Sequence, residues 1–479
     1  MQYKEFIFEE YLYDPTAYTL FLRYRYGGGP RFEERLVFDF APRQLSPEAS
    51  EALDRIFRLI LLMSGVSYYK SFIPRTLICE SFPLDRVTAE FLQKFYENGL
   101  AEFAFKNRVS LRGHFTIGFT DERPAAPIVL DLPRRSCVPV GGGKDSIVTL
   151  ECLKRCGEPL SLFSLGDAEP IRACIAAAGL PFIRVHRQLD SGLFKLTEAG
   201  ALNGHVPITG ILSAIALAGA VMTGCDTIIM SNEHSASAPN LQIGDTNVNH
   251  QYSKSLEFEE DFSEYLNKHI SPNISYFSLL RPLSEIEIAR RFTKYPEYFR
   301  VFRSCNTAFR QSPAERAREW CGNCPKCRFV FLALALSLEK PELIGIFGRN
   351  LLDDEIQLDG FAELCGLREH KPFECVGETA ESAAVMSYLG CHPDWRDDAV
   401  VRQLHGTFDV LRQRDPGAIR ALSEVKHPHR VPDRYMAMLD ACRCARCATS
   451  RDLGAGPRGE SCTRVSPKAS SGVAGHVAR

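Results

Sequence analysis

The chain has 479 residues, of which 45% are hydrophobic and 24% charged, with a formal net charge of −2. This is the composition of an ordinary globular protein, and the length allows two or three domains with a large core. A charge so close to zero gives no reason to expect nucleic acid or an acidic membrane as a partner. The first residues contain no apolar signal core, and the 17 cysteines do not form a short disulfide scaffold, so we expect a cytoplasmic protein with free or metal-bound thiols.

Residues 1–130 are predicted to form an N-terminal α+β domain. An antiparallel meander is expected from three stretches rich in aromatic and branched residues, which turn signals separate: residues 6–8, 18–24 and 36–40. Ser46 and Pro47 then begin a helix, as its N-cap and its first-turn proline. Residues 87–98 have the pattern of another amphipathic helix.

Residues 131–340 alternate between strand and helix patterns, which predicts an α/β fold with a doubly wound parallel sheet. The predicted strands cover residues 137–140, 160–165, 182–186, 227–231 and 274–280. An uncharged run at 206–225 has the length of a membrane span, but its place inside the alternating pattern favours a buried helix. Ligands of such sheets bind beyond the carboxyl ends of the strands, so the loops there are the expected site.

Residues 341–447 are predicted to be a C-terminal helical region, and residues 448–479 a disordered tail. Short helices are expected at residues 359–365, 378–389 and 399–412. From Arg443 onward the composition shifts to Gly, Ser, Arg and Pro. The tail borders another group of cysteines, for which the sequence offers no clear fourth metal ligand: Cys442, Cys444 and Cys447.

A phosphate-binding loop is predicted directly after the first strand of the parallel sheet. A helical pattern follows the six residues Gly141, Gly142, Gly143, Lys144, Asp145 and Ser146. Glycines let the backbone approach an anion, the helix N-terminus adds its dipole, and Lys144 can neutralise phosphate charge. A carboxylate beside a phosphate is repulsive unless a cation lies between them, so Asp145 predicts Mg²⁺. Asp145 also excludes a Walker A loop, and Ser146 excludes the dinucleotide-binding fingerprint.

The loop resembles the Ser-Gly-Gly-x-Asp-Ser loop of the PP-loop ATP pyrophosphatases, with Gly141 in place of the leading serine. This family has a HUP-like fold and includes GMP synthetase, asparagine synthetase and 7-cyano-7-deazaguanine synthase. The resemblance implies that ATP is split between its α and β phosphates and that a substrate is adenylated. It also implies that Ser164 and Leu165, at the end of the next strand, border the adenine and the ribose.

A cysteine knuckle is the other predicted metal site. Cys321, Cys324 and Cys327 are each separated by two residues, and Cys305 lies upstream. Four thiolates at such spacing suit one tetrahedral Zn²⁺ in a closed structural site, although an iron–sulfur cluster also accepts this spacing. The deazaguanine synthase carries a similar site after its sheet, and this resemblance favours zinc.

Three polar stretches near the expected cleft are candidates for binding the group that is adenylated: residues 203–209, 231–237 and 249–255. The first leads into a helix, whose free amides could bind a carboxylate or a phosphate. The predicted acid–base residues, in order of preference, are Glu233, His234, His205 and Lys254.

Five motifs, in this order, resemble those of the UDP-N-acetylmuramoyl-L-alanyl-L-glutamate epimerases: Gly-Gly-Gly-Lys-Asp-Ser, Asn-Gly-His-Val-Pro, Ser-Asn-Glu-His-Ser-Ala, Asn-His-Gln-Tyr-Ser-Lys-Ser and Trp-Cys-Gly-Asn-Cys-Pro-Lys-Cys. The resemblance extends over about residues 1–440. It implies that ATP, Mg²⁺ and water convert the terminal L-Glu of this peptidoglycan precursor to D-Glu, with release of AMP and diphosphate.

Adenylation makes such an inversion chemically reasonable, because the α-proton of a free carboxylate is hard to remove. In the adenylate, a side-chain base can take the proton, and reprotonation from the other face inverts the centre. Two other functions stay open. A deazaguanine-synthase-like or amide-forming ligase would need an amine as acceptor, and a non-catalytic nucleotide sensor with a zinc scaffold would release no diphosphate.

Overall fold

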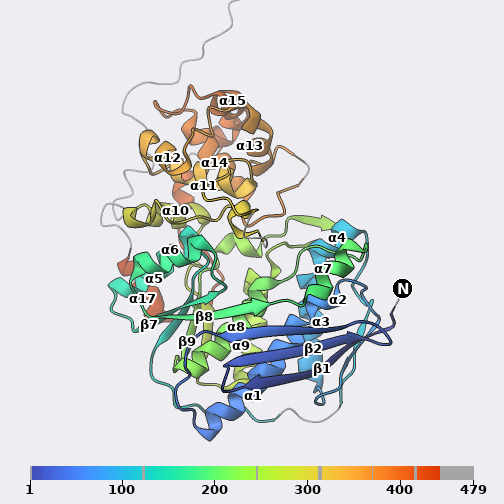
Figure 1. The fold of residues 1–479 in the computed structure, drawn as a ribbon. Coiled ribbons are helices and arrows are strands. Elements are labelled where there is room, and N and C mark those ends of the chain that lie inside the picture. Colours follow the sequence, from blue (N-terminus) through green and yellow to red (C-terminus); the bar gives the residue numbers. More distant parts are fainter. Residues whose placement is uncertain are drawn as a thin grey trace, which may run out of the picture.

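The computed structural model describes residues 3–120, 125–243, 246–310, 315–368, 370–414 and 418–442 (Figure 1). The predicted tail at 448–479, and Cys444 and Cys447 before it, lie outside these residues. The strands are β1 (Glu5–Asp14), β2 (Thr19–Tyr26), β3 (Arg31–Phe38), β4 (Thr76–Cys79), β5 (Thr116–Ile117), β6 (Ser136–Pro139), β7 (Leu160–Leu165), β8 (Phe182–Gln188), β9 (Thr227–Met230), β10 (Leu241–Ile243), β11 (Thr246–Val248) and β12 (Ser275–Ser278). The α-helices are α1 (Pro47–Ser64), α2 (Val66–Tyr69), α3 (Arg86–Gly99), α4 (Ala101–Asn107), α5 (Lys144–Arg155), α6 (Glu169–Ala178), α7 (Ser191–Glu198), α8 (Ile208–Thr223), α9 (Leu256–Tyr265), α10 (Glu285–Phe292), α11 (Pro325–Ala335), α12 (Lys340–Phe347), α13 (Leu358–Leu364), α14 (Thr379–Leu389), α15 (Ala399–Arg414), α16 (Ala418–Ala421) and α17 (Asp433–Ala441).

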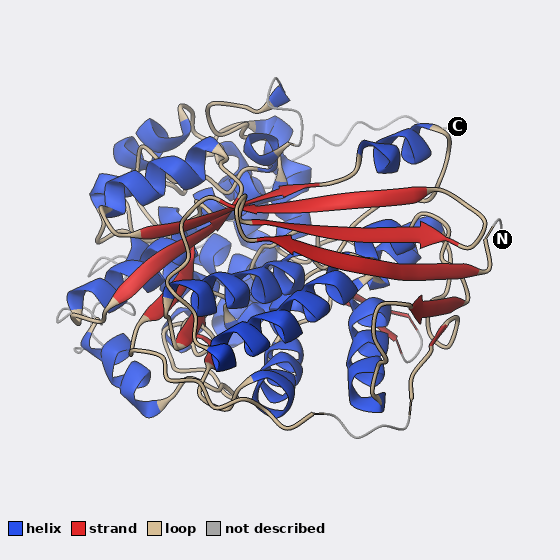
Figure 2. Cartoon of the chain, turned by 60° about the horizontal axis from the view of Figure 1, so that its bottom comes forward, coloured by secondary structure: helices blue, strands red, loops and turns tan. Residues whose placement is uncertain are grey.

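A mixed sheet of ten strands runs through the described residues, in the order β12-β9-β6-β7-β8-β3-β2-β1-β4-β5 (Figure 2). The five strands from β12 to β8 pair in parallel, and they are the five strands that the alternating pattern predicts. The predicted α/β class is therefore confirmed. From β6 the chain first moves to β7 and β8 on one side, and later returns to β9 and β12 on the other. The sheet thus has a topological switch point between β6 and β9.

The predicted N-terminal meander is confirmed as β1, β2 and β3. It continues the parallel sheet, because β3 pairs with β8 in the antiparallel direction. A buried ion pair spans this joint, with Nε of Arg187 2.7 Å from Oε1 of Glu34. The sequence offers no sign of this pairing, and the predicted domain boundaries at residues 130 and 340 stay predictions.

Side chains of the parallel strands alternate between two cores, because successive residues of a strand point to opposite faces. Cys137 and Ile228 face a core that includes residues of α1, α8 and α9. Their neighbours Val138 and Ile229 face a second core with residues of α5, α10 and α11. Helices therefore cover both faces of the sheet, as the doubly wound prediction requires (Figure 2).

The uncharged run at 206–225 forms α8, whose side chains are mostly buried in the first core, as predicted. Among the described residues, no helix combines the length and the hydropathy that a membrane crossing requires. The predicted C-terminal helices are confirmed as α13, α14 and α15, and Figure 1 shows them grouped with α11 and α12 beyond α10. Ser46 caps α1 as expected, with its hydroxyl accepting from the Ala49 amide at 3.2 Å.

Candidate active site

The glycine loop connects β6 to α5, in the strand–turn–helix arrangement that its sequence predicts. Gly142 has a φ of +79°, and a Cβ there would lie 3.0 Å from the backbone of Pro170, so this position requires glycine. Gly143 is the N-cap of α5 and makes no side-chain cap hydrogen bond. The amides of the first turn of α5 are therefore suited to bind an anion.

A cavity of about 570 Å³ lies over this loop, at the carboxyl ends of β6 and β9. This is the switch point of the sheet, where doubly wound folds bind ligands, and the volume is typical of a small-molecule site. All the predicted loop residues except Gly142 line the cavity, and so does Leu165 at the end of β7. Ser164 is buried next to Leu165, and its hydroxyl has no hydrogen-bond partner among the described residues.

Three carboxylates meet in this cavity: oxygen atoms of Asp145, Glu233 and Glu285 lie within 4.8 Å of one another. The buried Lys144 donates hydrogen bonds to both Asp145 and Glu285. Burial raises the pKa of Glu285, and although Lys144 opposes this, the neighbouring Asp145 and Glu233 raise it further. Three carboxylates this close need additional positive charge, and oxygen atoms are the ligands that Mg²⁺ prefers, so this donor set fits Mg²⁺.

Lys254 also lines the cavity, where its Nζ donates a hydrogen bond to Sγ of Cys375 at 3.1 Å. Burial alone would lower the pKa of Lys254, but the nearby Cys375 and Glu233 raise it above its ordinary value. The amine therefore stays protonated at neutral pH. A charged ammonium group suits stabilisation of negative charge better than proton abstraction.

The two histidines that the sequence predicts as acid–base residues lie outside the set that lines this cavity. Burial, and then the neighbouring His250, lower the pKa of His205 to about 3, so its ring stays neutral. Its Nδ1 lies 3.7 Å from Glu102, and its ring centroid is 4.3 Å from that of His250. His234 instead lines a second cavity. Of the four predicted residues, the structure thus brings Glu233 and Lys254 to the glycine loop.

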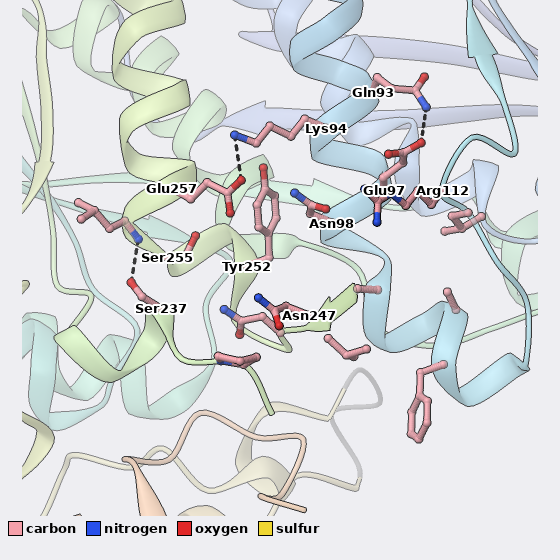
Figure 3. Close-up of a pocket in the computed structure, with 18 of the residues that line it drawn as sticks. Gln93, Lys94, Glu97, Asn98, Arg112, Ser237, Asn247, Tyr252, Ser255 and Glu257 are labelled. Atoms are coloured by element: carbon pink, nitrogen blue, oxygen red, sulfur yellow. Dashed lines mark hydrogen bonds and ion pairs between the residues drawn. The ribbon is translucent and has the colours of Figure 1, made fainter. Parts of the chain in front are cut away.

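The second cavity, of about 940 Å³, lies between α3 and the segment at 234–257 (Figure 3). Figure 3 shows Lys94 paired with Glu257, at 2.9 Å, and Glu97 accepting a hydrogen bond from Gln93. Glu90 and Glu260 add further carboxylates to the lining. Lys94, Arg112 and Arg281 offset part of this negative charge, but among the described residues no glycine lines this cavity. The cavity at the glycine loop is therefore the better candidate for a nucleotide.

The four predicted metal-binding cysteines lie together, with their sulfur atoms within 4.8 Å of one another. Sγ of Cys324 is 3.4 Å from that of Cys327 and 4.0 Å from that of Cys305, and Sγ of Cys321 is 3.7 Å from that of Cys327. A tetrahedral zinc ion with Zn–S bonds of about 2.3 Å would separate its sulfur ligands by about 3.8 Å. The geometry of the four thiols therefore fits Zn²⁺.

Two residues of the site were missed by reasoning from the sequence. Glu285 begins α10, shortly after the last parallel strand, so a closer reading of that strand end could have found it. Cys375 lies between α13 and α14, in a loop with no motif around it. Its neighbours in the cavity come from remote parts of the chain, and no local signal in the sequence could have placed it there.

Two family models match the chain: the MurL N-terminal domain at residues 1–279 and the MurL C-terminal domain at residues 301–417. The chain is also similar to three proteins named UDP-N-acetyl-alpha-D-muramoyl-L-alanyl-L-glutamate epimerase. That of Xanthomonas oryzae is 40% identical over 413 residues, which cover 86% of this chain and 91% of the relative. That of a Micromonospora species is 40% identical over 420 residues, covering 86% and 92%. That of Salinispora tropica is 43% identical over 381 residues, covering 79% and 82%.

Proposed function

Since the chain belongs to the family of UDP-N-acetyl-alpha-D-muramoyl-L-alanyl-L-glutamate epimerases, we propose that it inverts the glutamyl centre of this compound through an acyl adenylate made from ATP. The chain is then an isomerase that consumes ATP in the synthesis of a peptidoglycan precursor. The observation that carries the proposal is the glycine loop with Asp145 at the switch point of the sheet, where Glu233 and Lys254 line the same cavity. Because the substrates are ATP and a nucleotide-linked peptide, we assign the activity to the cytoplasm.

In the activation step, the loop at residues 141–146 binds the phosphates of ATP as a PP-loop does, and Leu165 borders the adenosine. A carboxylate oxygen of the glutamyl unit attacks the α-phosphorus, and the bond to the leaving diphosphate breaks. Asp145 and Glu285, with Glu233 beside them, would hold Mg²⁺. When bound, this ion neutralises phosphate charge and makes diphosphate a better leaving group.

In the inversion step, removal of the α-proton places negative charge on the acyl oxygen of the adenylate. The ammonium group of Lys254 stabilises that charge, which is the usual role of a fixed donor near a developing oxyanion. Glu233 is the other predicted acid–base residue that lines this cavity. Reprotonation on the opposite face and hydrolysis of the acyl–phosphate bond by water then release the inverted product and AMP.

A structural Zn²⁺ held by Cys305, Cys321, Cys324 and Cys327 would stabilise one wall of this site. Arg303, two residues before Cys305, donates its backbone amide to the carbonyl of Gly142 at 2.8 Å. Ser304 and Asn306, on either side of Cys305, line the cavity. A metal ion that fixes Cys305 to α11 would therefore also fix one wall of the nucleotide site.

The test is to incubate the protein with ATP, Mg²⁺ and UDP-N-acetylmuramoyl-L-alanyl-L-glutamate, and to measure AMP, diphosphate and glutamate chirality together. We expect D-Glu to form only when ATP is present, with one AMP for each inverted residue. In ²H₂O the product should carry deuterium at Cα. Diphosphate release that depends on an added amine would replace the epimerase by a ligase, and no diphosphate release with any carboxylate substrate would indicate a sensor.

A further inference from the structure

A chain of four polar side chains leads from α4 into the cavity at the glycine loop. The carboxylate of Glu102 contacts Nδ1 of His250, and His250 and Cys375 are close enough for each to shift the pKa of the other. On its other side, Cys375 accepts the hydrogen bond from Lys254 at 3.1 Å. An acid, an imidazole and a thiol in this order form the arrangement that activates cysteine in many enzymes. Nothing in the activation and inversion steps above uses Glu102, His250 or Cys375.

The surroundings of Cys375 favour its thiolate. Burial alone would raise the pKa of this thiol, but the positive charges of Lys254, Lys326 and His250, which face it, lower the pKa to about 6. Burial alone would lower the pKa of His250, but the neighbouring Cys375 and Glu102 raise it to about 9. At neutral pH the pair is thus a thiolate beside an imidazolium ion. Cys375 is only partly buried, and it is one of the residues that line the cavity.

We propose that Cys375 is a catalytic residue, whose thiolate exchanges the α-proton on one face of the activated glutamyl unit. This role rests on the proposed function. In the step, the Cα–H bond breaks, an S–H bond forms on Cys375, and the electron pair moves into the acyl group as an enolate next to Lys254. A water molecule delivers a proton to the opposite face and leaves hydroxide. The hydroxide then takes the proton from Cys375, so the thiolate is restored and the cycle is balanced.

A thiolate suits this task for two reasons. Its conjugate acid is weak enough to hold the proton yet titrates close to the operating pH, which is the condition for efficient proton transfer. The thiolate also belongs to the lining of the cavity and lies beside the ammonium group that stabilises the enolate. His250 and Glu102 are positioning residues in this scheme, because they hold Cys375 and supply its positive neighbour without contacting the substrate.

The first test compares Cys375→Ser with wild type in ²H₂O, with ATP, Mg²⁺ and the UDP-linked L-Glu dipeptide. Serine is nearly isosteric but far too weak an acid to form an alkoxide. We expect α-deuteration and D-Glu formation to fall by about 100-fold or more, while diphosphate and AMP release continue through hydrolysis of the uninverted adenylate. The matched control is Cys79→Ser in β4, a partly exposed thiol remote from the cavity, which should behave as wild type. Undiminished deuteration by Cys375→Ser would overturn the proposal.

The second test uses wild-type protein and does not depend on how well a variant folds. The alkylation rate of each cysteine by iodoacetamide is measured by peptide mass spectrometry between pH 5 and pH 9. The rate at Cys375 should rise with a midpoint near pH 6, because only the thiolate reacts, and the substrate with ATP should protect it. Burial raises the pKa of Cys79, so that thiol should react only at higher pH.

Two further outcomes would overturn the role of Cys375 without overturning the proposed function. The first is normal turnover in a protein whose Cys375 is alkylated no faster than Cys79 at pH 7. The second is a thioester of the precursor on Cys375 in quenched reactions, because the thiol would then act as a nucleophile. Absence of diphosphate release by wild-type protein would overturn the proposed function and, with it, this role. The alkylation profile separates the two cases, because it does not require turnover.

Discussion

Asp145 is the second residue of α5, and its carboxylate lies with those of Glu233 and Glu285 in the cavity over the glycine loop. Replacing Asp145 by Asn keeps the size of the side chain but removes the charge that faces the metal. We expect Asp145→Asn to reduce diphosphate release by at least about 100-fold, because the charge that holds the metal at the leaving diphosphate is lost. The fold should survive, because the side chain is 34% exposed.

The control for this variant is Asp131→Asn, which removes the same charge at an exposed position before β6. Its diphosphate release and its melting temperature should match those of wild type. Unchanged turnover in Asp145→Asn, measured by a coupled diphosphate assay at saturating Mg²⁺, would remove the basis for the PP-loop assignment.

Lys254 is the residue where the structure changes the expected chemistry most. Reasoning from the sequence placed it last among the possible bases, whereas its hydrogen bond to Cys375 and its raised pKa make it a fixed positive charge. We expect Lys254→Met to reduce α-deuteration by about 10²- to 10³-fold, because one oxyanion-stabilising donor is lost. It should also slow alkylation of Cys375 at pH 7, since the thiol loses a positive neighbour.

Lys254→Arg provides the control, because it keeps the charge while changing the shape of the donor. It should restore rapid alkylation of Cys375 and part of the deuteration. If Lys254→Met weakened only the binding of ATP and left deuteration at saturating ATP unchanged, Lys254 would belong to the nucleotide site instead.

At this scale the sequence predicted residues that belong to a motif. In the loop at 141–146 and in the knuckle of Cys321, Cys324 and Cys327, the residues that act together are close in the sequence. Their spacing alone therefore indicates their chemistry. Cys375 has no such neighbours, because its partners Lys254 and His250 are remote in the chain and meet it only in the fold. His234 shows the converse difficulty. It directly follows Glu233, yet the turn at this strand end directs the two side chains into different cavities.

Among the elements, the pairing of β3 with β8 joins the N-terminal meander to the parallel sheet. The Glu34 side chain is fully buried there, and its carboxylate binds the guanidinium group of Arg187, which also donates to the hydroxyl of Ser67. Removing one partner of a buried pair leaves the other charge uncompensated. We therefore expect Glu34→Gln to lower the free energy of unfolding by about 3–5 kcal/mol.

A neighbouring residue supplies the matched control. Glu33 precedes Glu34 on the same strand, and its carboxylate pairs with Arg23 and Arg35, whose side chains are 39% and 54% exposed to solvent. Glu33→Gln should cost about 1 kcal/mol or less in the same urea titration, because exposed pairs contribute little. Equal costs for the two variants would mean that the pair at the joint does not hold the two parts of the sheet together.

The elements themselves were largely predictable, and their connections were not. The apolar strands of the parallel sheet, the N-cap of α1 and the buried α8 each follow from local periodicity or capping. The pairing of β3 with β8 depends on which sheet edges are free once both parts have folded. A pattern with a period of two residues says which strands exist, but it does not say which strands become neighbours.

For the molecule as a whole, the C-terminal half completes a site that the parallel sheet begins. The glycine loop and Glu233 follow strands of the sheet, whereas Lys326 and Cys375 belong to α11 and to the loop before α14. The thiol cluster lies between these parts, because Cys305 precedes α11 and Cys324 caps it. The position of the cavity wall therefore depends on the same contacts that hold α11 in the second core.

Metal removal tests this dependence in the whole protein. Metal analysis should find about one zinc per chain, because four thiols in this geometry form one closed site. Stripping the zinc with a chelator, or replacing Cys324 by Ser, should lower the melting temperature, since metal binding contributes directly to folding free energy. It should also abolish diphosphate release, because Arg303 and Ser304 would no longer be held against the glycine loop.

Cys79→Ser is the control and should keep both zinc and activity. Iron with visible absorbance would replace the zinc site by an iron–sulfur cluster, and a metal-free protein of full stability and activity would contradict the site altogether.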